Sequence, residues 1–122
     1  MKNFAKPPIE LRRGYKSPKH LGKVAEMACM ACRIEPAPRA RRLNLHHLCG
    51  IGAGQKASDL LVLPLCEFHH QAGGVGHAIH SGVEIWEEKF GTQQSLILEI
   101  HEKLAITIYK NFLAKNDKIS KN

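Results

Sequence analysis

Polar and apolar positions alternate in one short stretch near the middle of the chain, residues 42–47 (RLNLHH). Successive side chains of a strand point to opposite faces, so this alternation predicts a strand whose two adjacent histidines have different surroundings. The apolar run 60–66 (LLVLPLC) predicts a second strand, and its proline favours an edge or a strand end. One face of the first strand would carry Leu43, Leu45 and His47, and the other Arg42, Asn44 and His46.

Helical spacing of apolar residues dominates the flanking segments. Apolar positions between Leu21 and Ala28 predict a short helix that begins at Pro18. Residues 83–90 (VEIWEEKF) predict a second helix, which Gly91 ends. Thr92 can cap a third, long amphipathic helix. Its apolar face would consist of Leu96, Ile97, Ile100, Leu104, Ile108 and Phe112.

Glycine-rich loops and polar ends complete the expected organisation. Residues 50–56 (GIGAGQK) and 71–76 (QAGGVG) are expected to be loops, with a turn of helix over 67–70 (EFHH) between the second strand and the second loop. Residues 1–18 contain three prolines and scattered cations, which predicts a basic flexible arm. Residues 19–115 would form one domain and 116–122 a frayed tail. We therefore expect a small α+β fold built around a hairpin.

Length and composition add a reason to look for a metal. A chain of 122 residues allows one modest domain, and its one Trp, two Tyr and four Phe supply a thin core. The N-terminus lacks the apolar core of a signal peptide, and no run approaches the roughly 20 apolar residues of a membrane span. We expect a cytoplasmic protein without a membrane partner, in which cysteines stay reduced and metal binding is favoured over disulfides.

The positive charge is concentrated in the first half of the chain. The net charge is +7, but residues 1–56 carry twelve Lys/Arg and three acids, whereas residues 57–122 carry six and eight. A basic, merely soluble protein would also have such a composition, but the clustering of the cations favours a nucleic-acid partner. The candidates for phosphate contacts that do not read sequence are Arg39, Arg41, Arg42 and Lys56.

Two short motifs have the spacing of metal ligands. Cys29-x-x-Cys32 and Cys66-x-x-His69 supply three thiolates and an imidazole, a set typical of structural zinc. A buried apolar pair or a redox dithiol is the alternative for the first motif, but the strand-to-helix context of a redox motif is missing. Cys49 lies apart from both motifs, as a substitute ligand or, as we favour, a small loop residue.

Several histidines are left over once His69 is assigned to zinc. They are His46, His47, His70, His77 and His80. Each alone is best explained as a surface or loop histidine with ordinary hydrogen bonds. As a cluster they favour a second metal ion with an adjacent general base, because imidazole is both a common metal ligand and the usual base near neutral pH.

The order of these motifs resembles the HNH endonucleases of the ββα-metal class. The order is CxxC, then HH, a glycine-rich segment, SDLLVLPLCEFHH and GHAIHSG. Within that class, HHLCGIGAGQKASDLLVLPLCEFHH followed by HAIHSGVEIWEEKFG is similar to phage-encoded recombination-enhancement (Ref-type) nucleases, and PKHLGKVAEMACMAC resembles how such proteins begin. The likeness covers about residues 18–103 and implies a ββα-metal core with a zinc knuckle, flanked by helices.

The resemblance also implies roles for individual residues. His46, His70 and His80 would bind the catalytic ion, with His77 as the alternative third ligand, and His47 would be the general base. Many HNH proteins have Asn at the position where this chain has Asp59. The carboxylate of Asp59 would brace the hairpin loop or orient His47. The catalytic ion would be Zn²⁺, Mg²⁺, Mn²⁺ or Ni²⁺, and three imidazoles suit the transition metals better than Mg²⁺.

The expected function is therefore metal-dependent hydrolysis of DNA phosphodiester bonds with little sequence preference, in a phage-encoded protein linked to recombination. Its partners would be DNA, as a single strand, a duplex or a recombination intermediate, and a recombinase filament. We expect a monomer or a weak dimer. The main alternative is a non-catalytic, zinc-stabilised DNA-binding module, and a further one is an accessory protein that assembles through its C-terminal helix.

Overall fold

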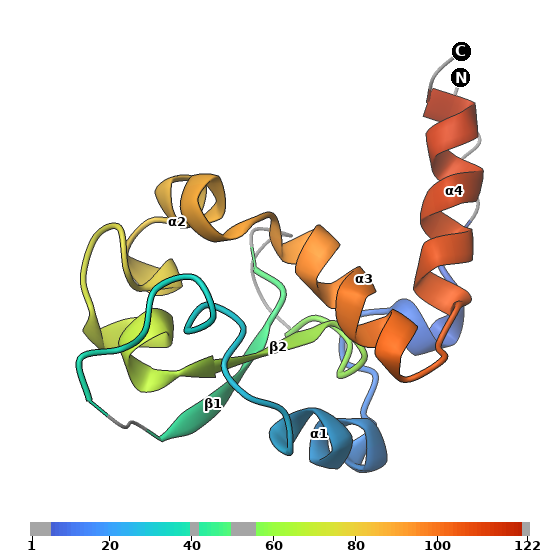
Figure 1. Cartoon of the computed structure of the whole chain (residues 1–122). Coiled ribbons are helices and arrows are strands. Elements are labelled where there is room, and N and C mark those ends of the chain that lie inside the picture. Colours follow the sequence, from blue (N-terminus) through green and yellow to red (C-terminus); the bar gives the residue numbers. More distant parts are fainter. Residues whose placement is uncertain (1–5, 40–41, 50–55, 121–122) are drawn as a thin grey trace.

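A computed structural model gives the structure of the protein and describes residues 6–39, 42–49 and 56–120, with side chains up to residue 116. The fold is mixed α+β, with one two-stranded sheet among helices, as the sequence predicts (Figure 1). The elements in order are η1 (Ile9–Leu11), α1 (Pro18–Ala25), β1 (Leu43–His47), β2 (Val62–Cys66), η2 (Phe68–Ala72), η3 (Ile79–Ser81), α2 (Val83–Phe90), α3 (Gln93–Lys103) and α4 (Ile108–Ser120).

The two predicted strands form an antiparallel hairpin in which Leu45 faces Pro64. Hydrogen bonds from Leu48 N–H to Leu61 O and from Glu67 N–H to Arg42 O flank the ladder at both ends. Pro64 sits in a pair whose backbone groups point away from the partner strand, and its carbonyl accepts instead from Met30 N–H. The missing N–H of this proline therefore removes no hydrogen bond between β1 and β2.

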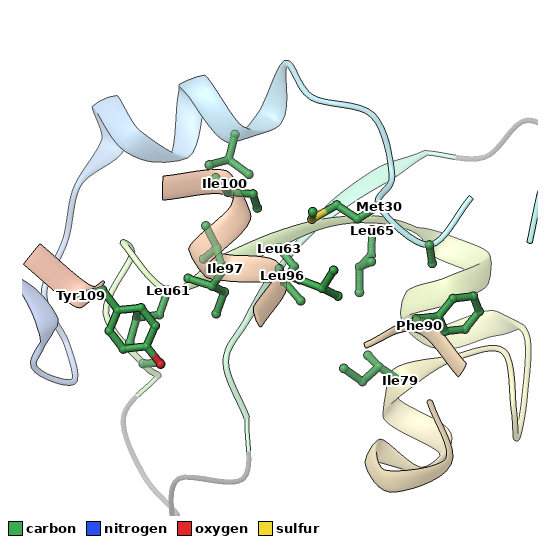
Figure 2. Packing of buried hydrophobic residues seen from close by; sticks show 14 of the residues in the cluster. Met30, Leu61, Leu63, Leu65, Ile79, Phe90, Leu96, Ile97, Ile100 and Tyr109 are labelled. Atoms are coloured by element: carbon green, nitrogen blue, oxygen red, sulfur yellow. The ribbon is translucent and has the colours of Figure 1, made fainter. Parts of the chain in front are cut away.

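The core lies between the hairpin and the helices. Residues paired across the strands share a face, so Asn44 and His46 lie on the same face as Leu63 and Leu65. Figure 2 shows Leu63 beside apolar side chains of α3. Burying each such side chain contributes about 1.5–3 kcal/mol. The largest fully buried apolar residues are Val24, Val62, Leu63, Pro64, Leu65, Ile79, Trp86, Ile97 and Ile100.

Three predicted helix boundaries are confirmed. Pro18 occupies the first turn of α1, where its missing N–H needs no partner, and Ser17 Oγ caps the helix by accepting from His20 N–H. Gly91 ends α2 with a φ of 106°, a conformation that favours glycine. Thr92 Oγ1 caps α3 by accepting from Ser95 N–H. None of the helices in the described ranges is long and apolar enough to cross a membrane.

The expected long C-terminal helix is wrong, because the chain breaks between α3 and α4. Ala105 adopts a φ of 59°. Its N–H donates to Glu102 O, and Ile106 N–H donates to His101 O, which together form the two bonds of a Schellman cap. This cap normally has glycine at the position of Ala105, so the sequence gives no stop signal. The β-branched run 106–108 favours the break because such residues are poor helix formers.

Residues 6–17 also differ from the expected flexible arm. Ile9–Leu11 form a turn of 3-10 helix, and Leu11 is buried in the core. Gly14 N–H donates to Lys56 O, and the segment runs directly into α1. Apolar residues were scarce in this segment, but one leucine and backbone hydrogen bonds suffice to dock it.

Two histidines outside the predicted clusters are buried against one another. The His20 and His101 rings make an edge-to-face contact, with centroids 5.7 Å apart, and their side chains are almost fully buried. His101 Nε2–H donates to Leu60 O at 2.7 Å. His20 Nε2 and His101 Nδ1 have no hydrogen-bond partner within the described residues. Burial lowers the pKa of both imidazoles below 6.5, so the native state holds them neutral.

This pair predicts loss of stability in acid. Below about pH 6.5 the unfolded chain takes up protons that the native state excludes, so stability is complete above that pH and falls as the pH decreases. The expected cost reaches at most about 1.4 kcal/mol per pH unit for each histidine, at pH values between its unfolded-state pKa and its lowered native pKa. Thermal unfolding of the wild type and His101→Gln, between pH 7.5 and 5.5 in excess zinc, should show a shallower decline for the variant. Protonation of the metal ligands affects both proteins alike and therefore cancels in this comparison. Equal declines in the two proteins would contradict the prediction.

Candidate functional site

The two motifs with ligand spacing meet at one end of β2. Cys29 and Cys32 come from the loop after α1, Cys66 is the last residue of β2 and His69 lies in η2. The sulfur atoms of Cys32 and Cys66 are 3.7 Å apart. His69 Nδ1 is 3.6 Å from the sulfurs of Cys29 and Cys32 and 3.4 Å from that of Cys66. We call these four residues the knuckle.

The distances in the knuckle suit a tetrahedral ion such as zinc. Zinc bond lengths imply about 3.8 Å between two sulfur ligands and about 3.6 Å between a sulfur and a nitrogen ligand. Burial raises the pKa of Cys29 to about 12, so this thiol ionises near neutral pH only beside a cation. Burial lowers the pKa of His69 and keeps it neutral, as a ligand must be. The knuckle could therefore hold a metal ion.

Glu35 supports the knuckle from outside. Its Oε1 lies 3.2 Å from His69 Nε2 and accepts from His77 Nδ1 at 2.9 Å, and its Oε2 accepts from Lys89 Nζ at 2.5 Å. The hydrogen bonds from His77 and Lys89 lower the pKa of Glu35 to about 2. An ionised carboxylate on the far nitrogen of a ligating imidazole fixes its orientation and makes it a better ligand.

A second group of possible ligands lies on the other side of η2. One ring nitrogen from each of His46, His70 and His80 lies within 4.8 Å of the others. His70 Nε2 and His80 Nε2 are 3.0 Å apart, which is the separation of two nitrogen ligands at about 90° to each other, as in octahedral coordination, on one ion with bonds of about 2.1 Å. Exposure increases from buried His46 to exposed His80, so this group opens to solvent whereas the knuckle is largely enclosed.

Two amides determine which imidazole nitrogens are available. Gln93 Oε1 accepts from Cys49 N–H, and Gln93 Nε2 donates to Cys49 O, which fixes the orientation of this amide. His46 Nε2 lies 2.9 Å from Gln93 Oε1 and must donate to it, so the lone pair is on Nδ1. Asn44 Oδ1 accepts from His70 Nδ1 at 2.9 Å and leaves Nε2 with the lone pair.

Burial keeps the inner imidazoles of this group neutral. It lowers the pKa of His46 to about 4, although the hydrogen bond from His46 to Gln93 opposes the shift. Burial also lowers the pKa of His70. Both rings are therefore neutral at physiological pH and could bind a divalent ion without first losing a proton.

His47 faces the opposite side of β1 and contacts Asp59. His47 Nε2 lies 2.8 Å from Asp59 Oδ1, and Asp59 Oδ2 accepts from Ser17 N–H at 2.8 Å. Burial favours the neutral form of Asp59, but the hydrogen bonds from His47 and Ser17 outweigh it and lower the pKa. An ionised carboxylate only accepts, so His47 Nε2 carries the proton and Nδ1 the lone pair. This is the contact that an orienting role for Asp59 requires.

The remaining candidate residues are more scattered. His77 contacts Glu35 and is not part of the second group. Arg39, Arg42 and Lys56 are exposed, and Arg39 lines a hollow beside the knuckle. Arg41 lies outside the described residues, as do the glycines of the 50–55 loop. Cys49 belongs to neither ligand group and contacts Gln93.

Three supporting residues, Glu35, Asn44 and Gln93, were not predicted. Asn44 could have been found, because strand alternation places it on the face of His46. Glu35 follows the first cysteine pair closely, but nothing in the sequence relates it to His69. Gln93 is 47 residues from its partner His46, at the start of a helix, and has no local signal at all.

Comparisons with known proteins identify a family without assigning an activity. A sequence model described as "Protein of unknown function (DUF968)" matches residues 2–108. The chain is also 36% identical over 101 residues to "Uncharacterized protein YdfU" of Escherichia coli strain K12. That match covers 80% of this chain and 26% of YdfU, so the chain spans about a quarter of this relative's length. Comparison with solved structures gives no significant match.

The knuckle predicts that Cys29→Ser removes a bound zinc ion and destabilises the fold. The contribution of metal binding to folding would be lost, so we expect the free energy of unfolding to be at least about 3 kcal/mol lower than in the wild type. Cys49→Ser is the matched control, because it makes the same replacement outside the knuckle. Metal analysis and thermal unfolding should show one zinc fewer and a lower Tm only for Cys29→Ser. A zinc-free Cys29→Ser protein with wild-type stability would contradict the assignment.

The second group predicts a separate ion that depends on His80 and not on His77. With zinc already bound in the knuckle, we expect titration with Zn²⁺ or Ni²⁺ to show one further ion on the wild type, none on His80→Ala and one on His77→Ala. Isothermal titration calorimetry of the zinc-loaded proteins provides the measurement. The two variants lose the same chemical group from neighbouring turns, so an equal effect of both would show that His80 has no special role.

Proposed function

Because this chain belongs to the DUF968 family, whose description assigns no activity, we propose a function from the site itself: metal-dependent hydrolysis of nucleic-acid phosphodiester bonds. The fold would be the ββα-metal core of the HNH endonucleases. The hairpin of β1 and β2 leads directly into η2, a five-residue helical turn that carries both His69 and His70, and this strand–strand–helix order supports the proposal.

One observation carries the proposal: the chain has two separate groups of potential ligands with different accessibility. A structural metal ion needs the enclosed knuckle alone. The group of His46, His70 and His80 reaches the surface and has only three imidazoles, so a bound ion would keep positions for substrate oxygens. A protein that merely used zinc for stability would have no need for this second group.

His47, the second residue of the histidine pair, is the proposed general base. With Nε2–H donated to Asp59, His47 presents its Nδ1 lone pair and can take a proton from a water molecule that attacks phosphorus. Asp59 would hold the tautomer and stabilise the charge that His47 acquires, as the carboxylate does in catalytic triads. Adjacent positions on one strand thus separate ion binding by His46 from proton transfer by His47.

A divalent ion held by His46, His70 and His80 would neutralise charge on the phosphate and on the leaving oxygen. Imidazole ligands favour Zn²⁺ or Ni²⁺ over Mg²⁺ and Mn²⁺, which prefer oxygen ligands. In the knuckle we propose a structural Zn²⁺. Its three thiolates and one imidazole are the usual set for such a site.

The substrate class follows from the charge of the chain. Residues 1–56 carry twelve cations and three acids, and exposed Arg39, Arg42 and Lys56 are available for backbone phosphates. Such contacts position a strand without reading its bases, so we propose DNA cleavage with little sequence preference. The resemblance to Ref-type nucleases adds recombination intermediates and a recombinase filament as the proposed setting. A non-catalytic DNA-binding module is the second candidate, favoured by the same basic charge.

Plasmid nicking tests the activity. We expect the wild type to nick supercoiled DNA in at least one of Mg²⁺, Mn²⁺, Ni²⁺ and Zn²⁺, and His47→Ala to be inactive. Asp59→Asn should retain the fold but lose about 10²- to 10⁴-fold in rate, because the amide can favour the wrong tautomer of His47.

The His47→Ala protein must still bind DNA and melt near the wild-type temperature for its inactivity to be informative. Nicking by His47→Ala at the wild-type rate would remove the base assignment. A wild-type protein that binds DNA and gives no product with any of the four ions would leave the binding module as the function.

A further inference from the structure

The N-terminal segment is attached to the part of the chain that carries Asp59. Four hydrogen bonds join residues 10–17 to residues 56–59. They run from Gly14 N–H to Lys56 O (3.0 Å), from Asp59 N–H to Tyr15 O (3.0 Å), from Ser17 N–H to Asp59 Oδ2 (2.8 Å) and from Ser58 Oγ to Glu10 O (2.5 Å). Buried Leu11 anchors the same segment in the core.

These bonds hold Asp59 at both its backbone and its carboxylate. Tyr15 accepts from the backbone N–H of Asp59, and Ser17 donates to the carboxylate oxygen that His47 does not use. Ser17 is also the N-cap of α1, so the helix fixes the donor in place. The position of the His47 ring therefore depends on residues 15–17, which lie about thirty positions before it in the sequence.

Lys16 lies between Tyr15 and Ser17, the two residues that form hydrogen bonds with Asp59. Lys16 is exposed and close enough to Asp59 for its charge to help lower the pKa of that carboxyl group. Its ammonium group makes no hydrogen bond or ion pair with any residue in the described part of the chain. Lys56 is exposed as well, and its backbone is bonded to Gly14, two residues from Lys16. Exposed Lys16 thus lies beside the His47–Asp59 pair, and exposed Lys56 is joined to the same segment through its backbone.

We propose that Lys16, together with Lys56, binds a backbone phosphate of the nucleic-acid strand beside the phosphate that water attacks. This inference rests on the proposed function and adds the N-terminal segment to the substrate-binding surface. A polyanion approaching His47 meets the carboxylate of Asp59, whose side chain is only 7% exposed, and the exposed Lys16 beside it. Lysine binds phosphate as a point charge, so the contact would position the strand without selecting bases.

A purely structural role for Lys16 is the competing explanation. The lysine would then offset the charge of Asp59, and its loss would change stability but not affinity. His47 and Ser17 already donate hydrogen bonds to this carboxylate, so Asp59 needs no third partner. The two explanations therefore differ in what the substitution Lys16→Gln changes.

Fluorescence anisotropy with a labelled 20-nucleotide strand and its duplex tests the contact, with zinc-loaded full-length protein and no other divalent ion. We expect Lys16→Gln to weaken binding about 3- to 10-fold for every sequence and to reduce the slope of log Kd against log salt by about 1. Lys16→Arg should restore most of the affinity. Lys110→Gln, which removes the same charge from exposed α4, should bind like the wild type.

Nicking kinetics separate this inference from the proposed function. If the wild type cleaves, Lys16→Gln should raise KM with little change in kcat or its pH profile, because the His47–Asp59 contact is intact. Wild-type affinity and salt dependence in Lys16→Gln, whatever its Tm, would overturn the inference, as would a wild type that binds no nucleic acid. Loss of affinity in Lys16→Gln without nicking by any protein would support the contact and refute the hydrolase.

Discussion

The convergence of three cysteines and one imidazole at a site that could hold a metal ion is the constraint on which the rest of the arrangement depends. Cys29, Cys32 and Cys66 lie around His69 at distances that suit one tetrahedral ion, and burial keeps the thiol of Cys29 protonated in the absence of such a charge. The cluster ties the loop after α1 to the end of β2 and to η2. Because His70 follows His69 directly, the same cluster also determines where the second ligand group can form.

The hairpin places the two adjacent histidines of β1 on its opposite faces. His46 lies with Asn44 on the face that meets His70, and both amide partners, Asn44 and Gln93, fix the nitrogen that each imidazole presents. His47 lies on the other face with Asp59. A shift of register by one residue would exchange these surroundings, so the register of the hairpin decides which of the two histidines meets His70 as well as how the strands pack.

The sequence predicts the parts of this arrangement that depend on local pattern. Strand alternation separated His46 from His47, and the Cys-x-x-Cys and Cys-x-x-His spacings identified four residues that do come together. The break after α3 was missed because Ala105 occupies a position where glycine is the usual signal. The docking of residues 6–17 was missed because it depends on backbone hydrogen bonds, which leave no trace in composition. The contacts of Glu35 and Gln93 depend on tertiary packing, which no local pattern encodes.

Three of the candidate residues, His69, His47 and His46, are therefore each supported by a residue from another segment. Glu35 comes from the knuckle loop, Asp59 is held by the N-terminal segment, and Gln93 begins α3 while its backbone N–H donates to Glu87 of α2. The geometry of the His46 group depends on the packing of these helices. Loosening the connection between α2 and α3 would release Gln93, whose amide orients His46. In a domain with so few large aromatic side chains, a metal ion in the knuckle and the packing of the helices would stabilise the same geometry, and each would depend on the other.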